Sequence, residues 1–207
     1  MIKSTKKLWD DCCFDRYVLC VLIAVELLMS FTFLGYIHLP PISVTIAYIP
    51  ILVAGSLFSP LQSAAVGAVF GIASMYKASA SYVFPADAVF SPFLSEAPLN
   101  SILLSIGTRA LFGFLIGAAY LWVRQAKYHR LWRGVISMIA PKIHSLIVYS
   151  AMGILFPRLG YHYSSALQWD WGDAIFAAIC VMAVELLWIL YQSNVMQNIK
   201  MCIDQSV

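Results

Sequence analysis

Long apolar runs separated by short polar stretches are the feature that most limits how this chain folds. Of its 207 residues, 61% are hydrophobic and 11% are charged. A soluble domain of ordinary composition carries about 25% charged residues. A soluble core of this length has no room for so much apolar surface, whereas a bilayer accommodates it. Since one helix crosses the hydrocarbon with about 20 apolar residues, the sequence predicts a bundle of membrane-spanning helices.

Six apolar segments can be followed along the chain. The second is short and continues an extended stretch over 42–47, and the third is rich in alanine and glycine. We therefore predict an all-α integral membrane protein with a segment 1–16, a six-helix transmembrane domain 17–192 and a tail 193–207. The expected spans are 17–37, 48–58, 62–76, 101–123, 134–156 and 172–191.

The distribution of lysine and arginine predicts the orientation of these spans. With six spans, only Lys77 and Arg158 fall in loops on one side. Loops rich in Lys and Arg stay in the cytoplasm, so we expect both termini to be cytoplasmic and the long loops 1, 3 and 5 to be extracellular. The basic residues on the cytoplasmic side are Lys3, Lys6, Lys7, Arg16, Arg124, Lys127, Arg130, Arg133 and Lys200.

The predicted outer loops are rich in aromatic residues, and two readings remain open. Aromatic side chains form belts at membrane interfaces, and long loops with prolines also form lids over binding pockets. Two glycine pairs inside spans, Gly67-xxx-Gly71 and Gly113-xxx-Gly117, predict close helix packing within the bundle.

Four ionisable residues lie inside predicted spans: Glu26, Arg109, Lys142 and Glu185. A charge in the hydrocarbon is costly, so each is expected to face the interior and to have a partner. We expect Lys142 and Glu185 to form an ion pair because they lie at similar depth. An arginine fork binds carboxylates and phosphates bidentately, so Arg109 either contacts a ligand or pairs with Asp87 or Glu26.

The histidines and cysteines give weaker signals. His144 is expected to be hydrogen-bonded within the bundle, whereas His38 and His162 fall in outer loops as surface residues or metal ligands. The five cysteines show no zinc-site spacing and no CxxC motif, so we expect reduced thiols and no metal site. A formal net charge of +3 gives no reason to expect nucleic acid binding.

Common catalytic motifs are absent from the sequence. It contains no GxxxxGK[ST] phosphate loop, no GxSxG and no HExxH, which are the signatures of ATP binding, serine hydrolysis and zinc hydrolysis. We expect no enzymatic activity of the chain itself.

The segment from Ile42 to Gly71 resembles the substrate-binding S components of energy-coupling factor (ECF) vitamin transporters, of the branch that includes folate, pantothenate and cobalamin proteins. A second similar passage starts at Ser91-Pro92-Phe93-Leu94 and Pro98 and runs from Arg109 to Gly117. The resemblance covers about residues 17–192. The residues that match the family pattern in the first segment are Pro50, Ala54, Gly55, Phe58, Pro60, Gly67 and Gly71.

The resemblance implies a multi-pass protein of the bacterial cell membrane that captures a vitamin or related micronutrient from outside. It implies no cofactor, and as partners a transmembrane T component and two ATPase subunits that hydrolyse ATP. S components often carry Ala-xxx-Ala on the first helix for docking, and the best match here is Cys20-xxx-Ala24. The implied substrate-binding residues are Tyr36, His38, Ser43, Thr45, Tyr48, Tyr82, Phe84, Asp87, Phe93, Arg109, Tyr163 and Trp169.

The sequence leaves the substrate and one competing function open. Arg109 indicates an acidic vitamin such as pantothenate or folate, whereas His38 and His162 suit a corrinoid such as cobalamin or a haem-like molecule. The alternative function is a membrane-embedded ligand sensor that signals to a separate partner protein.

Overall fold

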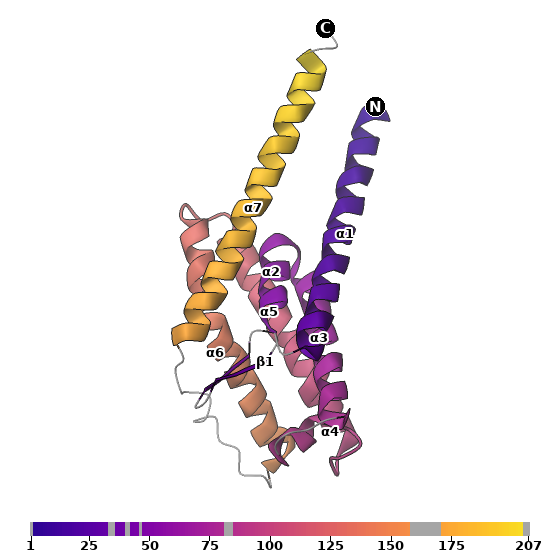
Figure 1. The fold of residues 1–207 in the computed structure, drawn as a ribbon, viewed down its shortest axis with the longest axis vertical. Helices are drawn as coiled ribbons and strands as arrows, with labels where there is room; N and C mark the ends of the chain where they lie inside the picture. Colours follow the sequence, from indigo (N-terminus) through magenta and orange to yellow (C-terminus); the bar gives the residue numbers. More distant parts are fainter. Residues whose placement is uncertain are drawn as a thin grey trace.

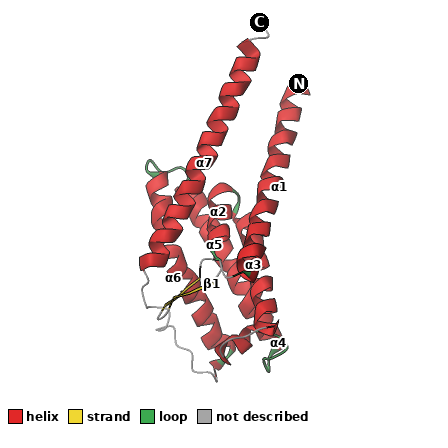
Figure 2. Cartoon of the chain, viewed as in Figure 1, coloured by secondary structure: helices red, strands yellow, loops and turns green. Residues whose placement is uncertain are grey.

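The computed structural model describes residues 2–32, 36–39, 42–45, 47–80, 85–157 and 171–204, and the side chains of 15–32, 47–80, 88–157 and 174–191. Its regular structure is helical apart from one short antiparallel hairpin (Figures 1 and 2). The elements are α1 (Ile2–Phe31), β1 (Tyr36–Leu39), β2 (Ile42–Thr45), α2 (Ile49–Leu57), α3 (Pro60–Ala80), the 3-10 helix η2 (Pro85–Phe90), α4 (Pro98–Ile102), the π-helical η3 (Leu103–Gly107), α5 (Thr108–Val123), α6 (His129–Leu155) and α7 (Trp171–Asp204).

Three helices of the described chain are long and apolar enough to cross a membrane. They are Pro98–Val123, which joins α4, η3 and α5, then His129–Leu155, and Ala174–Tyr191. Large apolar side chains such as Leu99, Ile154 and Leu187 stand exposed on them, as expected where lipid replaces water. These helices mark the chain as a membrane protein.

The short helix α2 lies at the centre of the bundle. It contacts α1, α3, α5, α6 and α7, and every residue from Pro50 to Ser56 is buried. A helix that is apolar all round has to be enclosed by other helices. Its nine residues extend only about 14 Å, which is too short to span a bilayer, so α2 serves as the core around which the longer helices pack.

Glycines bring the backbones of α3 and α5 into direct contact, as the small-residue pairs predicted. A Cβ atom on Gly71 would lie 2.5 Å from the Ser105 carbonyl oxygen, and one on Gly117 would lie 2.7 Å from Pro60 Cα. Gly67 and Gly113 face the backbone of the opposite helix in the same way. Only residues without a side chain allow helices to approach this closely.

The ends of several helices differ from the predicted spans. The helix α1 begins at Ile2 and ends at Phe31, where the sequence predicted a span over 17–37, and Tyr36 and Ile37 lie in the strand β1. The helix α7 continues to Asp204, through most of the predicted tail 193–207.

The sequence predicted a turn at 59–61, but Pro60 is already the first residue of α3. Ser59 caps this helix reciprocally, because its N–H donates to Gln62 Oε1 at 2.9 Å while its hydroxyl faces the Gln62 N–H at 3.4 Å. This S-x-x-Q arrangement is a capping box. Similarly, α6 starts at His129, five residues before the predicted span.

The early start of α6 corrects the predicted ion pair. Arg133 lies in the second turn of α6, and its Nη1 donates to Glu185 Oε1 of α7 at 2.8 Å. Glu185 therefore pairs with Arg133 and not with Lys142, which lies about 14 Å further along the same helix. Ser137 extends the polar contact, because its hydroxyl donates to the Arg133 carbonyl and lies 2.8 Å from the Tyr120 hydroxyl of α5.

A glycine substitution tests the contact between α3 and α5. In Gly71→Ala the new methyl group meets the rigid backbone of Ser105 and Ile106, and overpacking of this kind costs about 1–3 kcal/mol. In Gly107→Ala the methyl group meets only the flexible end of Leu103. We expect Gly71→Ala to lower the melting temperature in detergent and Gly107→Ala to leave it near that of the parent. Equal melting temperatures for the two variants would contradict the contact.

The Arg133–Glu185 pair is tested by charge removal. Removing one partner of a buried pair costs about 3–5 kcal/mol, so we expect Glu185→Gln to lower the free energy of unfolding in SDS by that order. The swap Arg133→Glu with Glu185→Arg should recover part of the loss. Lys142→Gln leaves the pair intact and serves as the control. A loss in this control as large as in Glu185→Gln, without recovery in the swap, would contradict the assignment.

Candidate ligand-binding site

Arg109 is a buried cation held at the start of α5. Its Nη1 donates to the Ser105 carbonyl at 3.0 Å and to the Leu104 carbonyl at 3.4 Å, and its Nη2 donates to Ser74 Oγ of α3 at 3.1 Å. The π-turn η3 explains why those carbonyls accept side chains. In this turn the N–H of Thr108 donates to the carbonyl of Leu103, five residues earlier. π-turns of this kind are frequent at functional sites.

Two aromatic rings enclose the Arg109 guanidinium. Its central carbon lies 5.0 Å from the ring centroid of Phe70 on α3 and 5.2 Å from that of Phe90 at the end of η2. Cations within about 6 Å of a ring are attracted by its quadrupole. The segment with Phe90 is fixed in place because Ser105 Oγ donates to the Phe90 carbonyl at 2.9 Å. The third loop therefore closes over Arg109 at this point.

Glu26 of α1 places a carboxyl group in the same core. It is fully buried, and Ser30 Oγ donates to its Oε1 at 3.0 Å. Its Oε2 has no hydrogen-bond partner among the described residues. The two readings for Arg109, contact with a ligand or pairing with Asp87 or Glu26, both stay predictions.

His144 of α6 completes the cluster, but it is not bonded as predicted. Its Nε2 is buried and has no hydrogen-bond partner in the described part of the chain. Three rings surround the imidazole, with centroids 5.1 Å away for Phe112, 6.1 Å for Phe70 and 6.4 Å for Tyr48. An unsatisfied nitrogen in an aromatic enclosure is a group that a ligand can bond.

The hairpin β1–β2 brings four predicted ligand-binding residues into register. Tyr36 pairs with Thr45, and His38 pairs with Ser43. Tyr48 follows β2 after only two residues, at the start of α2, and is buried against His144. Of the expected ligand-binding residues in the first loop and second helix, Tyr48 is therefore the one that the structure brings to His144.

The other predicted site residues are less well placed or lie outside the described part. Phe93 is 86% exposed, so the structure does not bring it to Arg109. Asp87 is described only by its backbone, within η2. On α1, Cys20 and Ala24 both face outward, one turn apart. Outside the described residues lie Tyr82, Phe84, His162, Tyr163 and Trp169.

The residues that sequence reasoning missed are the aromatic walls and one serine. Phe70, Phe90 and Phe112 sit in apolar or aromatic stretches with nothing in their spacing to single them out, and Ser74 is one of many small residues on α3. The sequence signal that could have led to these residues was His144, because a histidine inside a span is rare and polar groups inside membranes mark functional sites.

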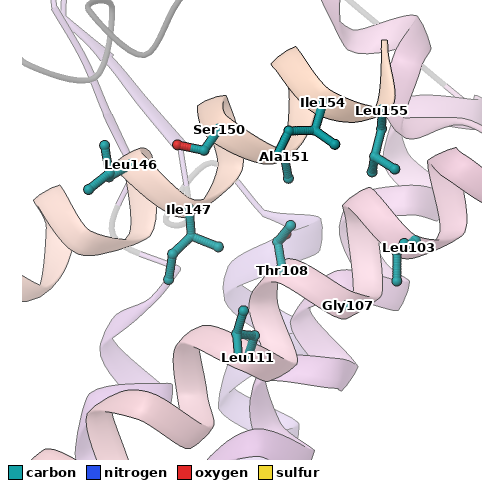
Figure 3. Close-up of a pocket in the computed structure, with 10 residues that line it drawn as sticks. All are labelled: Leu103, Gly107, Thr108, Leu111, Leu146, Ile147, Ser150, Ala151, Ile154 and Leu155. Carbon is teal, nitrogen blue, oxygen red and sulfur yellow. The ribbon is translucent and has the colours of Figure 1, made fainter.

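An open apolar groove of about 560 Å³ lies elsewhere on the molecule, between η3 and the start of α5 on one side and the second half of α6 on the other. Figure 3 shows Thr108 and Leu111 facing Ile147 and Ala151 across it. The Thr108 hydroxyl already donates to the Leu104 carbonyl. Binding sites need a few polar groups that fix ligand orientation, so we place the candidate site in the polar cluster and not in this groove.

The polar cluster offers groups that could bind a ligand. The described residues include no group of three His, Cys, Asp or Glu side chains that could hold a metal ion. What the cluster offers is a fixed cation, a carboxylate oxygen and an imidazole nitrogen with unused bonding capacity, and several aromatic faces.

Comparison with known proteins adds no identification. No family model matches the chain, and no curated protein is similar to it in sequence.

The state of His144 is tested by a substitution that keeps the ring shape. Because Nε2 has no hydrogen bond to lose, we expect His144→Phe to change the free energy of unfolding by no more than about 1 kcal/mol. Phe112→Ala leaves a cavity beside it and should cost about 3–5 kcal/mol. If SDS titration finds His144→Phe as destabilising as Phe112→Ala, the imidazole is bonded within the protein and the candidate site is wrong.

Proposed function

We propose that the chain is the substrate-binding S component of an ECF-type importer, with six transmembrane helices in the bacterial cell membrane and both termini in the cytoplasm. The observation that carries the proposal is the cluster of Glu26, Arg109 and His144, in which two buried polar atoms, Glu26 Oε2 and His144 Nε2, have no hydrogen-bond partner among the described residues. A bundle that served only as a scaffold gains nothing from three ionisable groups there, since each is costly in a membrane.

The ligand chemistry follows from the cluster. The hydrogen bond from Arg109 to Ser74 joins two side chains, and it is the one that a ligand carboxylate would replace. His144 Nε2 would bond a second polar group, while Tyr48, Phe70 and Phe112 supply apolar walls. This favours an acidic vitamin such as pantothenate or folate. A corrinoid such as cobalamin or a haem-like molecule would instead use His38 and His162 of the outer loops.

The outward face of α1 supports the partner assignment. Cys20 and Ala24 are both exposed and lie four residues apart on one face of the helix. Small residues at this spacing let another helix approach closely, as docking on a T component requires. In this proposal the loaded chain topples in the membrane on that component, and the two ATPase subunits supply the energy, so the chain itself has no catalytic role.

The length of α7 favours a second candidate function, that of a ligand sensor. The apolar part ends at Tyr191, but the helix continues to Asp204, and it projects beyond the bundle together with the start of α1 (Figure 1). A rigid helix that leaves the membrane is a means of passing a ligand-induced movement to a cytoplasmic partner. Co-purification separates the two functions: T and ATPase subunits indicate transport, and a signalling protein indicates sensing.

A thermal-shift screen of the purified chain against pantothenate, folate, cobalamin and haem tests the binding function. A ligand at 100 times its dissociation constant stabilises the folded form by about 2.7 kcal/mol. We expect one saturable increase in melting temperature, and we expect His144→Phe to keep the parent melting temperature without ligand but to lose the increase. If no compound stabilises the parent chain, the proposal loses its support. An increase that persists in His144→Phe moves the ligand away from the cluster.

A further inference from the structure

The turn between α5 and α6 carries an exposed group of cations that the proposed function does not use. We term residues 122–132 the basic turn. Arg124, Lys127 and Arg130 are all exposed on it, and it lies at the end of the bundle toward which α1 and α7 project (Figure 1). The turn is ordered by backbone hydrogen bonds, including those from Ala126 N–H to the Val123 carbonyl and from His129 N–H to the Ala126 carbonyl.

Within the part of the chain whose side chains the structure describes, the cations of the basic turn form no ion pair. The sequence has no Asp or Glu between Glu96 and Asp170, so neither α5 nor α6 offers a carboxylate. Arg133, one turn beyond Arg130, is directed inward to Glu185. Among the described residues, none of the three exposed cations forms an ion pair. The Lys127 ammonium does lie 5.5 Å from the ring of Tyr128, which orders the lysine but does not neutralise it.

The position of the basic turn along the helices places its charges at the membrane surface. The apolar span of α5 ends at Val123, and that of α6 begins at His129. Large amphipathic rings flank the charges and point outward, since Trp122 is 85% exposed and Trp132 is 51% exposed. Exposed Trp and Tyr side chains of membrane proteins lie at the level of the lipid headgroups.

The first turn of α6 adds a further preference for negative charge. No side chain caps this helix at Tyr128, and its first turn contains no acidic residue. The helix dipole therefore favours an anion at this end. None of the described residues next to this end of α6 provides an anion.

We propose that the basic turn is a binding site for the headgroup of an anionic phospholipid, with Arg124, Lys127 and Arg130 around the phosphate and with Trp122 and Trp132 along the acyl chains. An anionic lipid fits better than a zwitterionic one, because a choline or ethanolamine headgroup adds a cation of its own to an already positive site. It also fits better than an acidic protein segment, because the exposed tryptophans beside the cations need an apolar environment. Cytoplasmic leaflets, which receive basic loops, carry such lipids.

Tryptophan quenching by brominated lipids tests the proposal. The full chain is reconstituted into phosphatidylcholine vesicles that contain equal mole fractions of either brominated phosphatidylglycerol or brominated phosphatidylcholine. We expect stronger quenching by the brominated phosphatidylglycerol, and we expect high salt to reduce the difference. The combined variant Trp122→Phe with Trp132→Phe should lose the extra quenching, which assigns it to the basic turn and not to the other four tryptophans of the chain, since the sequence has six in total.

Charge removal supplies the decisive comparison. The triple variant combines Arg124→Gln, Lys127→Gln and Arg130→Gln. Its preference for phosphatidylglycerol should fall by up to about fivefold for each cation removed. Lys77→Gln, at the end of α3, removes a cation elsewhere and should change nothing, and Lys127→Arg should retain the preference. Equal quenching by the two lipids in the parent chain overturns the proposal, as does a preference that survives in the triple variant. Binding of soluble polyglutamate by the parent chain, without any lipid preference, would replace the lipid with an acidic protein partner.

Discussion

The contact between α3 and α5 is the constraint on which the rest of the molecule depends. Because glycines lie where the two backbones meet, the helices approach closely enough for Arg109 to reach Ser74 on the neighbouring helix. The same approach sets Phe70 against the guanidinium. A bundle held together by larger residues would separate the helices and leave the arginine without these partners, and an unsatisfied cation in the hydrocarbon is very costly. The polar cluster is therefore possible only because α3 and α5 touch.

Much of the fold could be predicted from the sequence because it follows from local patterns. Apolar run length identified the apolar parts of the long helices but not the polar extensions of α1 over 2–16 and of α7 over 192–204. The spacing of the glycine pairs identified the contact between α3 and α5. The early start of α6 at His129 could not be predicted in this way. Its first turns contain basic residues, so a hydropathy criterion assigns them to the loop. That error displaced Arg133 from the helix and led to the wrong partner for Glu185.

The candidate site could be predicted only in part, because it is assembled by packing. Arg109 and Glu26 were recognisable as charges inside spans, and both are buried, in agreement with the rule that such charges face the interior. The sequence does not show that His144 Nε2 remains unsatisfied, since this depends on which rings surround it. It also does not show that Phe90, and not the exposed Phe93, covers the arginine. Both facts arise from contacts between distant segments.

The π-turn η3 divides the helix from Pro98 to Val123 into two halves. Which residues one half presents on a given side does not fix which residues the other half presents there. Relative to an α-helix, such a turn accommodates one additional residue, and each residue rotates the helix by about 100°. A single-residue deletion in η3 would leave Gly113 and Gly117 against α3, while turning Asn100, which now donates to the Leu155 carbonyl of α6, to another side. The half of the helix that contains Pro98 can thus change the residues it presents through one insertion or deletion, without loss of the glycine contact. In evolutionary terms, η3 is a joint at which the contacts of this half can vary independently of the fold.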